Sequence, residues 1–225
     1  MALLATILVN IYGLRLKLSK NDTQRKKLRY DYCSKQLELL RISVKIANPE
    51  KLPTEGKYVF LINHRSIIDP PVLEVIFGKN PIFGHWISKK ELYNSFFFGL
   101  FVRNAGTILL DREASQMGGF FKEIKEKVAL GDSIFMFPEG TRNKTDEELT
   151  PFKDGSRIIA LKNRIPMLPI YIKTRTNEAV TAAMNDPKLH QELIVMIGDP
   201  IDYKDKSVNI EDAYREMFGI EAREK

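Results

Sequence analysis

The chain has 225 residues, of which 44% are hydrophobic and 28% charged, a balance that excludes a disordered chain and a multi-pass membrane protein. The length allows one good-sized domain with a substantial core. A single cysteine, Cys33, excludes an internal disulfide framework and any metal site built from several cysteines. The net charge of +6 favours an anionic partner, nucleic acid or membrane, if the charge is concentrated.

The basic charge is concentrated near the N-terminus. Residues 15 to 45 hold ten basic and three acidic residues, a net charge of +7, whereas the rest of the chain carries −1. The rest is therefore nearly neutral, and the basic character belongs to an N-terminal arm.

The first 14 residues are apolar apart from Thr6 and Asn10. As a helix they would span roughly 21 Å, which is short of the ~30 Å hydrocarbon core of a bilayer. No basic region precedes them and no clear cleavage site follows, so a secretory signal peptide fits poorly.

The next pattern predicts an amphipathic helix that Asn21 or Asp22 caps and that Asn48-Pro49 ends. Its apolar positions recur at spacings of four, three and four: Cys33, Leu37, Leu40 and Val44. An apolar segment followed by a basic helix is typical of an arm lying on an anionic membrane surface. The alternative is a helix that packs on the domain with its charges in solvent. Nucleic acid is not expected, because the arm's tyrosines form no stacking platform and no recognition motif follows.

The remaining chain alternates short apolar runs with helical patterns, which predicts an α/β fold with a mixed, largely parallel central sheet flanked by helices. We expect an N-terminal helical membrane-associating arm over residues 1–50 and one domain over residues 51–225. Strands are predicted at 58–62, 107–110, 133–137, 167–172 and 193–197, and helices at about 114–130 and 154–163.

An aromatic segment, residues 96–102, has two interpretations. It is either a core helix, or the lining of an apolar groove or a surface that meets lipid.

The first predicted strand of the domain runs into Asn63-His64, with Asp69 five residues beyond the histidine. Five residues turn a helix by about 500°, and Pro70 biases Asp69 away from helical angles, so the segment is predicted to be a strand-to-helix loop. There a carboxylate can orient the imidazole and support it as a general base. The alternative is a capping histidine and a turn aspartate. No metal is expected, because no cluster with ligand spacing surrounds His64.

Two later segments supply cations at strand ends. Phe137-Pro138-Glu139-Gly140-Thr141-Arg142 suits a backbone cradle for an anion, with Arg142 as a bidentate phosphate contact. The other segment, residues 106–112, lies between the His64–Asp69 loop and this one and ends in Arg112. Because ligand sites in open α/β sheets gather at the carboxyl ends of strands, these segments are expected to meet.

With NHRSIID, GTILLDR, FPEGTR and IPMLPI in this order over residues 63–170, the sequence resembles the glycerolipid acyltransferases of the 1-acylglycerol-3-phosphate acyltransferase type. The resemblance implies an O-acyltransferase that makes phosphatidate for phospholipid synthesis. The acyl donor would be acyl-CoA or an acyl carrier protein thioester, and the acceptor the sn-2 hydroxyl of lysophosphatidate. It implies no resident cofactor and a place at the cytoplasmic face of the cell membrane. Ile108 stands where many relatives have Phe, a mild departure.

The resemblance also implies residue roles. His64 is the general base and Asp69 orients it. The acceptor phosphate and its pocket are assigned to Arg112, Glu139, Gly140, Thr141 and Arg142. Auxiliary candidates from the residues themselves are Asn63, Ser66 as a local hydrogen-bonder, and Lys153 as a second phosphate contact or a solvated lysine. Alternatives remain open: Glu139 pairs with Arg142, the acceptor is glycerol 3-phosphate or another lysolipid, or the chain is a catalytically silent lipid-binding protein.

Overall fold

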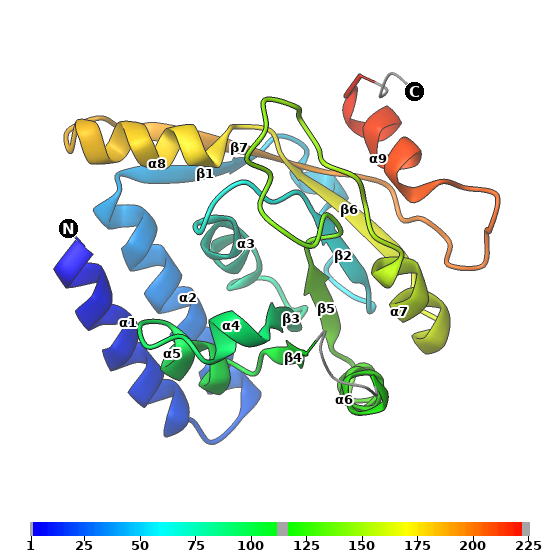
Figure 1. Cartoon of the computed structure of the whole chain (residues 1–225), viewed down its shortest axis with the longest axis horizontal. Coiled ribbons are helices and arrows are strands. Elements are labelled where there is room, and N and C mark those ends of the chain that lie inside the picture. Colours follow the sequence, from blue (N-terminus) through cyan, green and yellow to red (C-terminus); the bar gives the residue numbers. More distant parts are fainter. Residues whose placement is uncertain (1, 112–116, 222–225) are drawn as a thin grey trace.

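The computed structural model describes residues 2–111 and 117–221 and is built on one seven-stranded sheet with strand order β1-β7-β6-β2-β5-β3-β4 (Figure 1). Neighbouring strands pair in parallel except β6 and β7, which are antiparallel. The mixed, largely parallel sheet is therefore confirmed. The strands are β1 (Ile42–Ile46), β2 (Val59–Ile62), β3 (Gly84–Lys89), β4 (Ile108–Leu110), β5 (Ser133–Met136), β6 (Met167–Ile172) and β7 (Gln191–Ile197).

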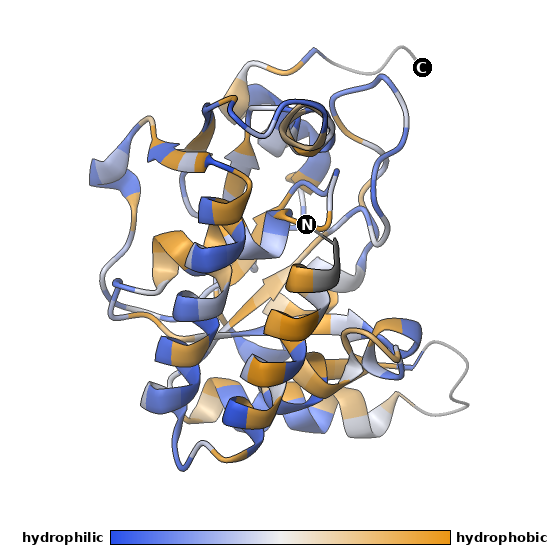
Figure 2. Ribbon diagram, turned by 90° about the vertical axis from the view of Figure 1, so that its left-hand side faces the viewer, coloured by the Kyte–Doolittle hydropathy of each residue, from blue (hydrophilic) through white to orange (hydrophobic). Residues whose placement is uncertain are grey.

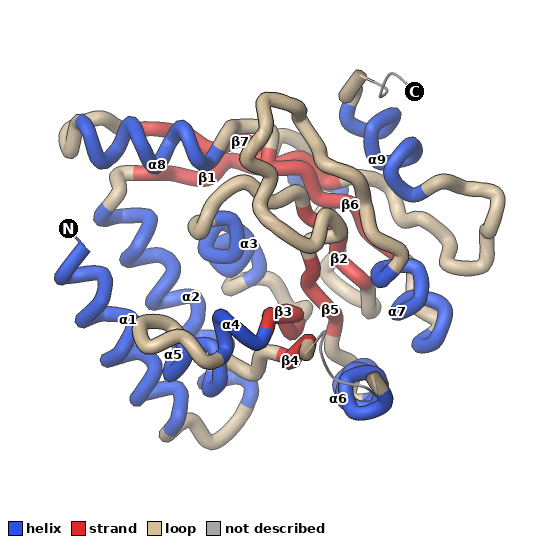
Figure 3. The backbone as a smooth tube through the Cα atoms, in the orientation of Figure 1, coloured by secondary structure: helices blue, strands red, loops and turns tan. Residues whose placement is uncertain are grey.

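Helices cover both faces of this sheet (Figure 3). They are α1 (Ala2–Lys17), α2 (Asp22–Leu39), α3 (Asp69–Phe77), α4 (Lys90–Tyr93), α5 (Gly99–Asn104), α6 (Gly118–Ala129), α7 (Gly155–Asn163), α8 (Thr176–Asn185) and α9 (Ile210–Phe218), with a 3-10 turn at Pro49–Lys51. The five predicted strands are confirmed, as are the helices now numbered α6 and α7; the first part of the helix predicted at 114–130, residues 114–116, lies outside the described residues.

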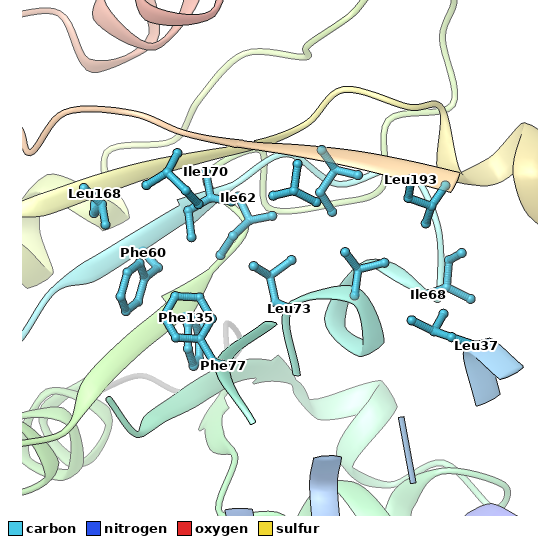
Figure 4. Packing of buried hydrophobic residues seen from close by; sticks show 14 of the residues in the cluster. Leu37, Phe60, Ile62, Ile68, Leu73, Phe77, Phe135, Leu168, Ile170 and Leu193 are labelled. Atoms are coloured by element: carbon cyan, nitrogen blue, oxygen red, sulfur yellow. The ribbon is translucent and has the colours of Figure 1, made fainter. Parts of the chain in front are cut away.

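Side-chain alternation along the strands feeds two separate cores, as expected for strands buried on both faces. In β2, Phe60 and Ile62 point to a cluster shared with α2, α3 and α8, whereas Val59 and Leu61 point to one shared with α6, α7 and α9. Figure 4 shows the first cluster, in which the Phe60 ring lies 4.9 Å from that of Phe135.

The prediction that the helix after Asn21 runs on to Asn48 is wrong at the C-terminal end. The helix begins as expected, with the Asn21 side chain accepting a hydrogen bond from the Gln24 amide, but it ends at Leu39. Arg41 has a left-handed φ of 53°, and β1 then pairs in parallel with β7. Val44 therefore belongs to an edge strand, because ladder bonds to a distant strand outweigh a local helical pattern.

Helix α2 packs on the domain through α3, as the alternative interpretation had it. Its Arg29 is 3% exposed and pairs with Glu74 of α3, and the Lys26 ammonium donates to the carbonyls of Asn80 and Ile82. Part of the basic charge is therefore used inside the protein, and does not face lipid.

Helix α1 buries one face and exposes the other. Val9, Tyr12 and Leu16 are buried, and a side chain at Gly13 would meet the α5 backbone at 3.0 Å, so α1 and α5 lie in close contact. The apolar stripe of α1, which consists of Leu4, Ile7, Ile11 and Leu14 together with Leu18 directly after the helix, remains exposed, and Figure 2 shows α1 facing the viewer with much of its length apolar. Within the described ranges, none of the helices is both long and apolar enough to cross a membrane.

The aromatic segment, residues 96–102, is divided between a loop and a helix. Phe96 is 90% exposed, and Phe97 and Phe98 are also exposed, in the loop that leads into α5. Residues 99–102 begin α5, which contacts α1, and the Phe101 ring is partly buried 4.5 Å from that of Tyr32. The exposed rings of this loop favour the interpretation of a surface that meets lipid.

Candidate active site

The loop between β2 and α3 brings His64 and Asp69 together. The His64 Nδ1 atom lies 2.7 Å from Asp69 Oδ2, and Asp69 is 1% exposed. Asp69 is the first residue of α3, so the expectation that Pro70 holds it out of helical angles is wrong. Pro70 falls in the first turn, where a helix leaves its N–H groups unpaired and tolerates proline.

The hydrogen bonds around Asp69 determine which nitrogen of His64 is free. Oδ2 also accepts from the backbone N–H groups of Arg65 at 2.6 Å and Ser66 at 2.7 Å. A carboxylate can only accept, so Nδ1 is assigned as the nitrogen that carries the proton and donates it. The lone pair of His64 therefore lies on Nε2, and Ser66 acts here through its backbone.

The His64 ring is held by stacking. It lies 3.8 Å from the Phe137 ring at an interplanar angle of 11°, and Phe137 in turn stacks on Trp86 at 5.2 Å. The His64 side chain is 17% exposed, so the imidazole is supported on one side and still accessible. This arrangement suits a base that must meet a substrate from solvent.

Glu139 faces inward and holds His64 by its backbone. It is 2% exposed; Oε1 accepts from the His64 N–H at 2.7 Å, and Oε2 accepts from the N–H and hydroxyl of Thr150 at 2.8 and 2.5 Å. Burial raises the pKa of Glu139, while the bonds from Thr150 and His64 act in the opposite direction. On the other side, the Asn143 N–H donates to the His64 carbonyl at 2.6 Å.

Glu139 of the FPEGTR segment and Asn143 directly after it therefore bond to the two backbone groups of His64. Both carboxylate oxygens of Glu139 bond to His64 and Thr150, whereas the resemblance assigned Glu139 to the acceptor. In the described part of the chain Glu139 and Arg142 form no ion pair.

Asn63 ties the same loop to the neighbouring strand. Its side-chain amide donates to the Ile172 carbonyl at 3.1 Å and accepts from the Ile172 N–H at 2.8 Å. Asn63 is 3% exposed, so its side chain joins the end of β2 to the end of β6 and does not form a surface contact.

Three side chains of the predicted phosphate site are exposed: Thr141, Arg142 and Lys153. The Lys153 N–H donates to the Pro138 carbonyl at 2.8 Å, which keeps Lys153 beside the FPEGTR turn. Gly140 makes that turn with a positive φ of 71°. Neither Arg142 nor Lys153 has a side-chain hydrogen bond or ion pair to another described residue, so both cations are available to an anion.

Arg112 lies outside the described residues. The residue before it, Asp111, forms an ion pair with Lys90 at 2.9 Å, just beyond the end of β4. In the ranges that the structure covers, no three His, Cys, Asp or Glu side chains are grouped so as to hold a metal.

Sequence reasoning missed several residues that build this site. Thr150 and Asn143 hold the FPEGTR segment to His64, and Thr176 donates its hydroxyl to Asp69 Oδ1. No local pattern signals these residues, because the loops that converge at one edge are decided by the adjacency of β6, β2 and β5 in the sheet.

Comparison with known proteins assigns the class. A family model described as Acyltransferase matches residues 43–173, and the chain belongs to this acyltransferase family. A 1-acyl-sn-glycerol-3-phosphate acyltransferase of Helicobacter pylori is 36% identical over 118 residues, which are 52% of this chain and 48% of the relative. The chain thus aligns with about half the length of that relative. The Bacillus subtilis protein of the same name is 29% identical over 188 residues, 78% of this chain and 84% of the relative.

A solved structure shares the fold. The crystal structure of the 1-acyl-sn-glycerophosphate (LPA) acyltransferase PlsC from Thermotoga maritima has a TM-score of 0.61 and 22% identity, with coverage of 99% of this chain and 97% of that one.

Proposed function

We propose that the chain transfers a fatty acyl group from an acyl thioester, acyl-CoA or acyl carrier protein, to the sn-2 hydroxyl of lysophosphatidate, making phosphatidate. The observation that carries the proposal is the free Nε2 of His64, held by Asp69 at 2.7 Å on the opposite nitrogen and flanked by a turn that bears exposed cations. The names of the relatives support the acceptor.

In the proposed step, His64 Nε2 removes the acceptor's hydroxyl proton as that oxygen attacks the thioester carbonyl. The carbonyl re-forms, the carbon–sulfur bond breaks, and the departing sulfur takes the proton from the imidazolium. No protein nucleophile is needed, since the acyl group passes directly between substrates. The acyl thioester is then the only cosubstrate, without a resident cofactor.

The test mixes purified protein with acyl-CoA or acyl carrier protein thioester and each of three acceptors: lysophosphatidate, glycerol 3-phosphate and lysophosphatidylcholine. Thiol release gives the rate, and mass spectrometry identifies the product. We expect transfer to lysophosphatidate. Burial raises the pKa of Cys33, so the native protein adds little thiol background. Preference for another acceptor would change the substrate, and lipid binding without turnover on any donor would favour a silent lipid-binding protein.

Arg142→Ala is expected to raise KM for lysophosphatidate about tenfold with a smaller change in kcat, because a charge-assisted contact to phosphate is lost. Initial rates over a range of acceptor concentrations measure it. Lys144→Ala, an exposed cation two residues further on, is the matched control. An unchanged KM in Arg142→Ala would remove this residue from the phosphate site.

We further propose that the protein works on an anionic membrane surface, at the cytoplasmic face of the cell membrane. Support comes from the exposed apolar stripe of α1 and from the exposed Phe96, in the loop before α5, the helix that packs on α1. Residues 2–17 contain no acidic side chain and end with Arg15 and Lys17. An apolar stripe with cations beside it matches an anionic interface.

The double variant Ile7→Ser/Ile11→Ser is expected to weaken binding to vesicles of phosphatidylcholine and phosphatidylglycerol by tenfold or more, because two half-exposed aliphatic side chains no longer enter the interface. Co-sedimentation measures the bound fraction. The control is Met184→Ser, since Met184 is 66% exposed on α8, away from the stripe. Equal loss in both variants, or none in either, would contradict the assigned surface.

A further inference from the structure

Asp69 has a fourth hydrogen-bond donor that lies outside the four motifs. The Thr176 hydroxyl donates to Asp69 Oδ1 at 2.5 Å, and both residues are 1% exposed. Thr176 is 107 residues from Asp69 in sequence and follows the segment matched by the family model, which ends at residue 173.

The fold holds Thr176 firmly in this place. It is the first residue of α8, four residues after β6 ends at Ile172, where Asn63 bonds to both backbone groups of Ile172. The preceding Arg175 donates to the Asp146 carbonyl at 2.5 Å and to Glu148 Oε1 at 3.2 Å. The loop that carries Thr176 is thus anchored on both sides of the site.

The two carboxylate oxygens of Asp69 accept different numbers of hydrogen bonds. Oδ2 has three donors, from His64, Arg65 and Ser66, whereas Thr176 is the described donor to Oδ1. The donors on Oδ2 fix the position of that oxygen, and a donor on Oδ1 fixes the plane of the carboxylate about it, which sets the direction in which Oδ2 meets His64 Nδ1.

Building on the proposed general-base mechanism, we propose that Thr176 is a positioning residue of the dyad: its hydroxyl locks the Asp69 carboxylate and thereby orients the His64 ring. Without the hydroxyl, Oδ1 would be buried without its described donor, and the hydrogen bond from Asp69 to the His64 ring would be less firmly directed.

The hydroxyl also influences the charge balance of the dyad. By donating to Asp69 it withdraws negative charge from the carboxylate, so its removal strengthens the attraction of Oδ2 for a protonated imidazole. Charged side chains near the dyad include Glu139, which accepts from the His64 N–H, and Arg65, whose guanidinium donates to the carbonyls of Thr145 and Glu147. Glu148 lies 3.7 Å from Arg65 and 3.2 Å from Arg175. None of these contacts is made by the Thr176 side chain.

The test compares Thr176→Val, which keeps the shape and removes the hydroxyl, with Thr176→Ser, which keeps the hydroxyl. For Thr176→Val we expect kcat about tenfold lower, KM within about twofold, and the acidic limb of the pH–rate profile displaced to higher pH. Thr176→Ser is expected to retain most of the wild-type kcat and the wild-type profile.

A second readout does not depend on turnover. Because the chain has three histidines, the His64 ring signals can be assigned by NMR with His64→Ala as reference, and we expect the Nδ1–H signal to lose intensity or move in Thr176→Val only. A valine variant with wild-type kcat, profile and ring signal would overturn the inference while leaving the acyl-transfer proposal intact. If the wild-type protein transferred acyl groups to none of the acceptors, while the His64 ring signal still responded in Thr176→Val, the proposed function alone would be overturned.

Discussion

His64→Ala is expected to lower kcat for acyl transfer by about a thousandfold, because a positioned general base contributes about 10²–10⁴ to such reactions. The proton on the acceptor hydroxyl then has to leave to water, which is neither oriented nor held beside the thioester. KM for lysophosphatidate is expected to change little, since the exposed cations of the FPEGTR turn remain. Thiol release under saturating substrates measures the effect.

His190→Ala is the matched control for this variant. His190 is exposed, and its ring contacts Arg41 at 3.2 Å, so its loss leaves the dyad untouched. Equal thermal melting curves for the two variants would show that the fold is retained. A His64→Ala enzyme with kcat within threefold of wild type would sink the general-base mechanism.

Arg29→Met is expected to lower the free energy of unfolding by about 3–5 kcal/mol, the range for breaking one side of a buried ion pair. Arg29 and Glu74 are 3% and 6% exposed, and Arg29 Nε lies 3.0 Å from each carboxylate oxygen. Glu74 also accepts from Trp86 Nε1 at 2.6 Å, and Arg29 also donates to the Gly84 carbonyl at 2.9 Å. Without the guanidinium, a buried carboxylate loses its compensating charge. Urea denaturation measures the change.

Two further variants make this result interpretable. Arg29→Met/Glu74→Gln removes both charges but keeps an acceptor for Trp86, and it is expected to recover a large part of the loss. Lys45→Met breaks the exposed Lys45–Glu192 pair at 3.9 Å and is expected to change stability by less than about 1 kcal/mol. A loss below about 1 kcal/mol for Arg29→Met would mean that α2 is not anchored by this pair.

The buried pair also changes how the N-terminal arm is understood. The charges of residues 15–45 predict one basic surface. In the structure, packing of α2 on α3 buries Arg29, which pairs with Glu74 and does not contribute to that surface. The apolar stripe of α1 is left as the exposed part of the arm. Sequence spacing alone could not separate these cases, because the side of α2 that is buried depends on where α3 lies.

Several features were determined by the sequence alone. Apolar runs such as residues 167–172 are strands because they supply side chains to cores on both faces of a sheet, and the motif order predicts a His64–Asp69 dyad, which the structure forms at 2.7 Å. The Asn21 cap is equally local, since it requires only an oxygen three residues before the amide it accepts.

Only the tertiary structure decided the rest. β1 forms because β7 offers it a partner about 150 residues away, and Glu139 faces inward because the His64 and Thr150 amides meet it there. Thr176 reaches Asp69 because β6 lies next to β2 in the sheet. Hydrogen bonds between distant segments depend on strand order, and strand order is set by packing of the whole core, which no local pattern of residues contains.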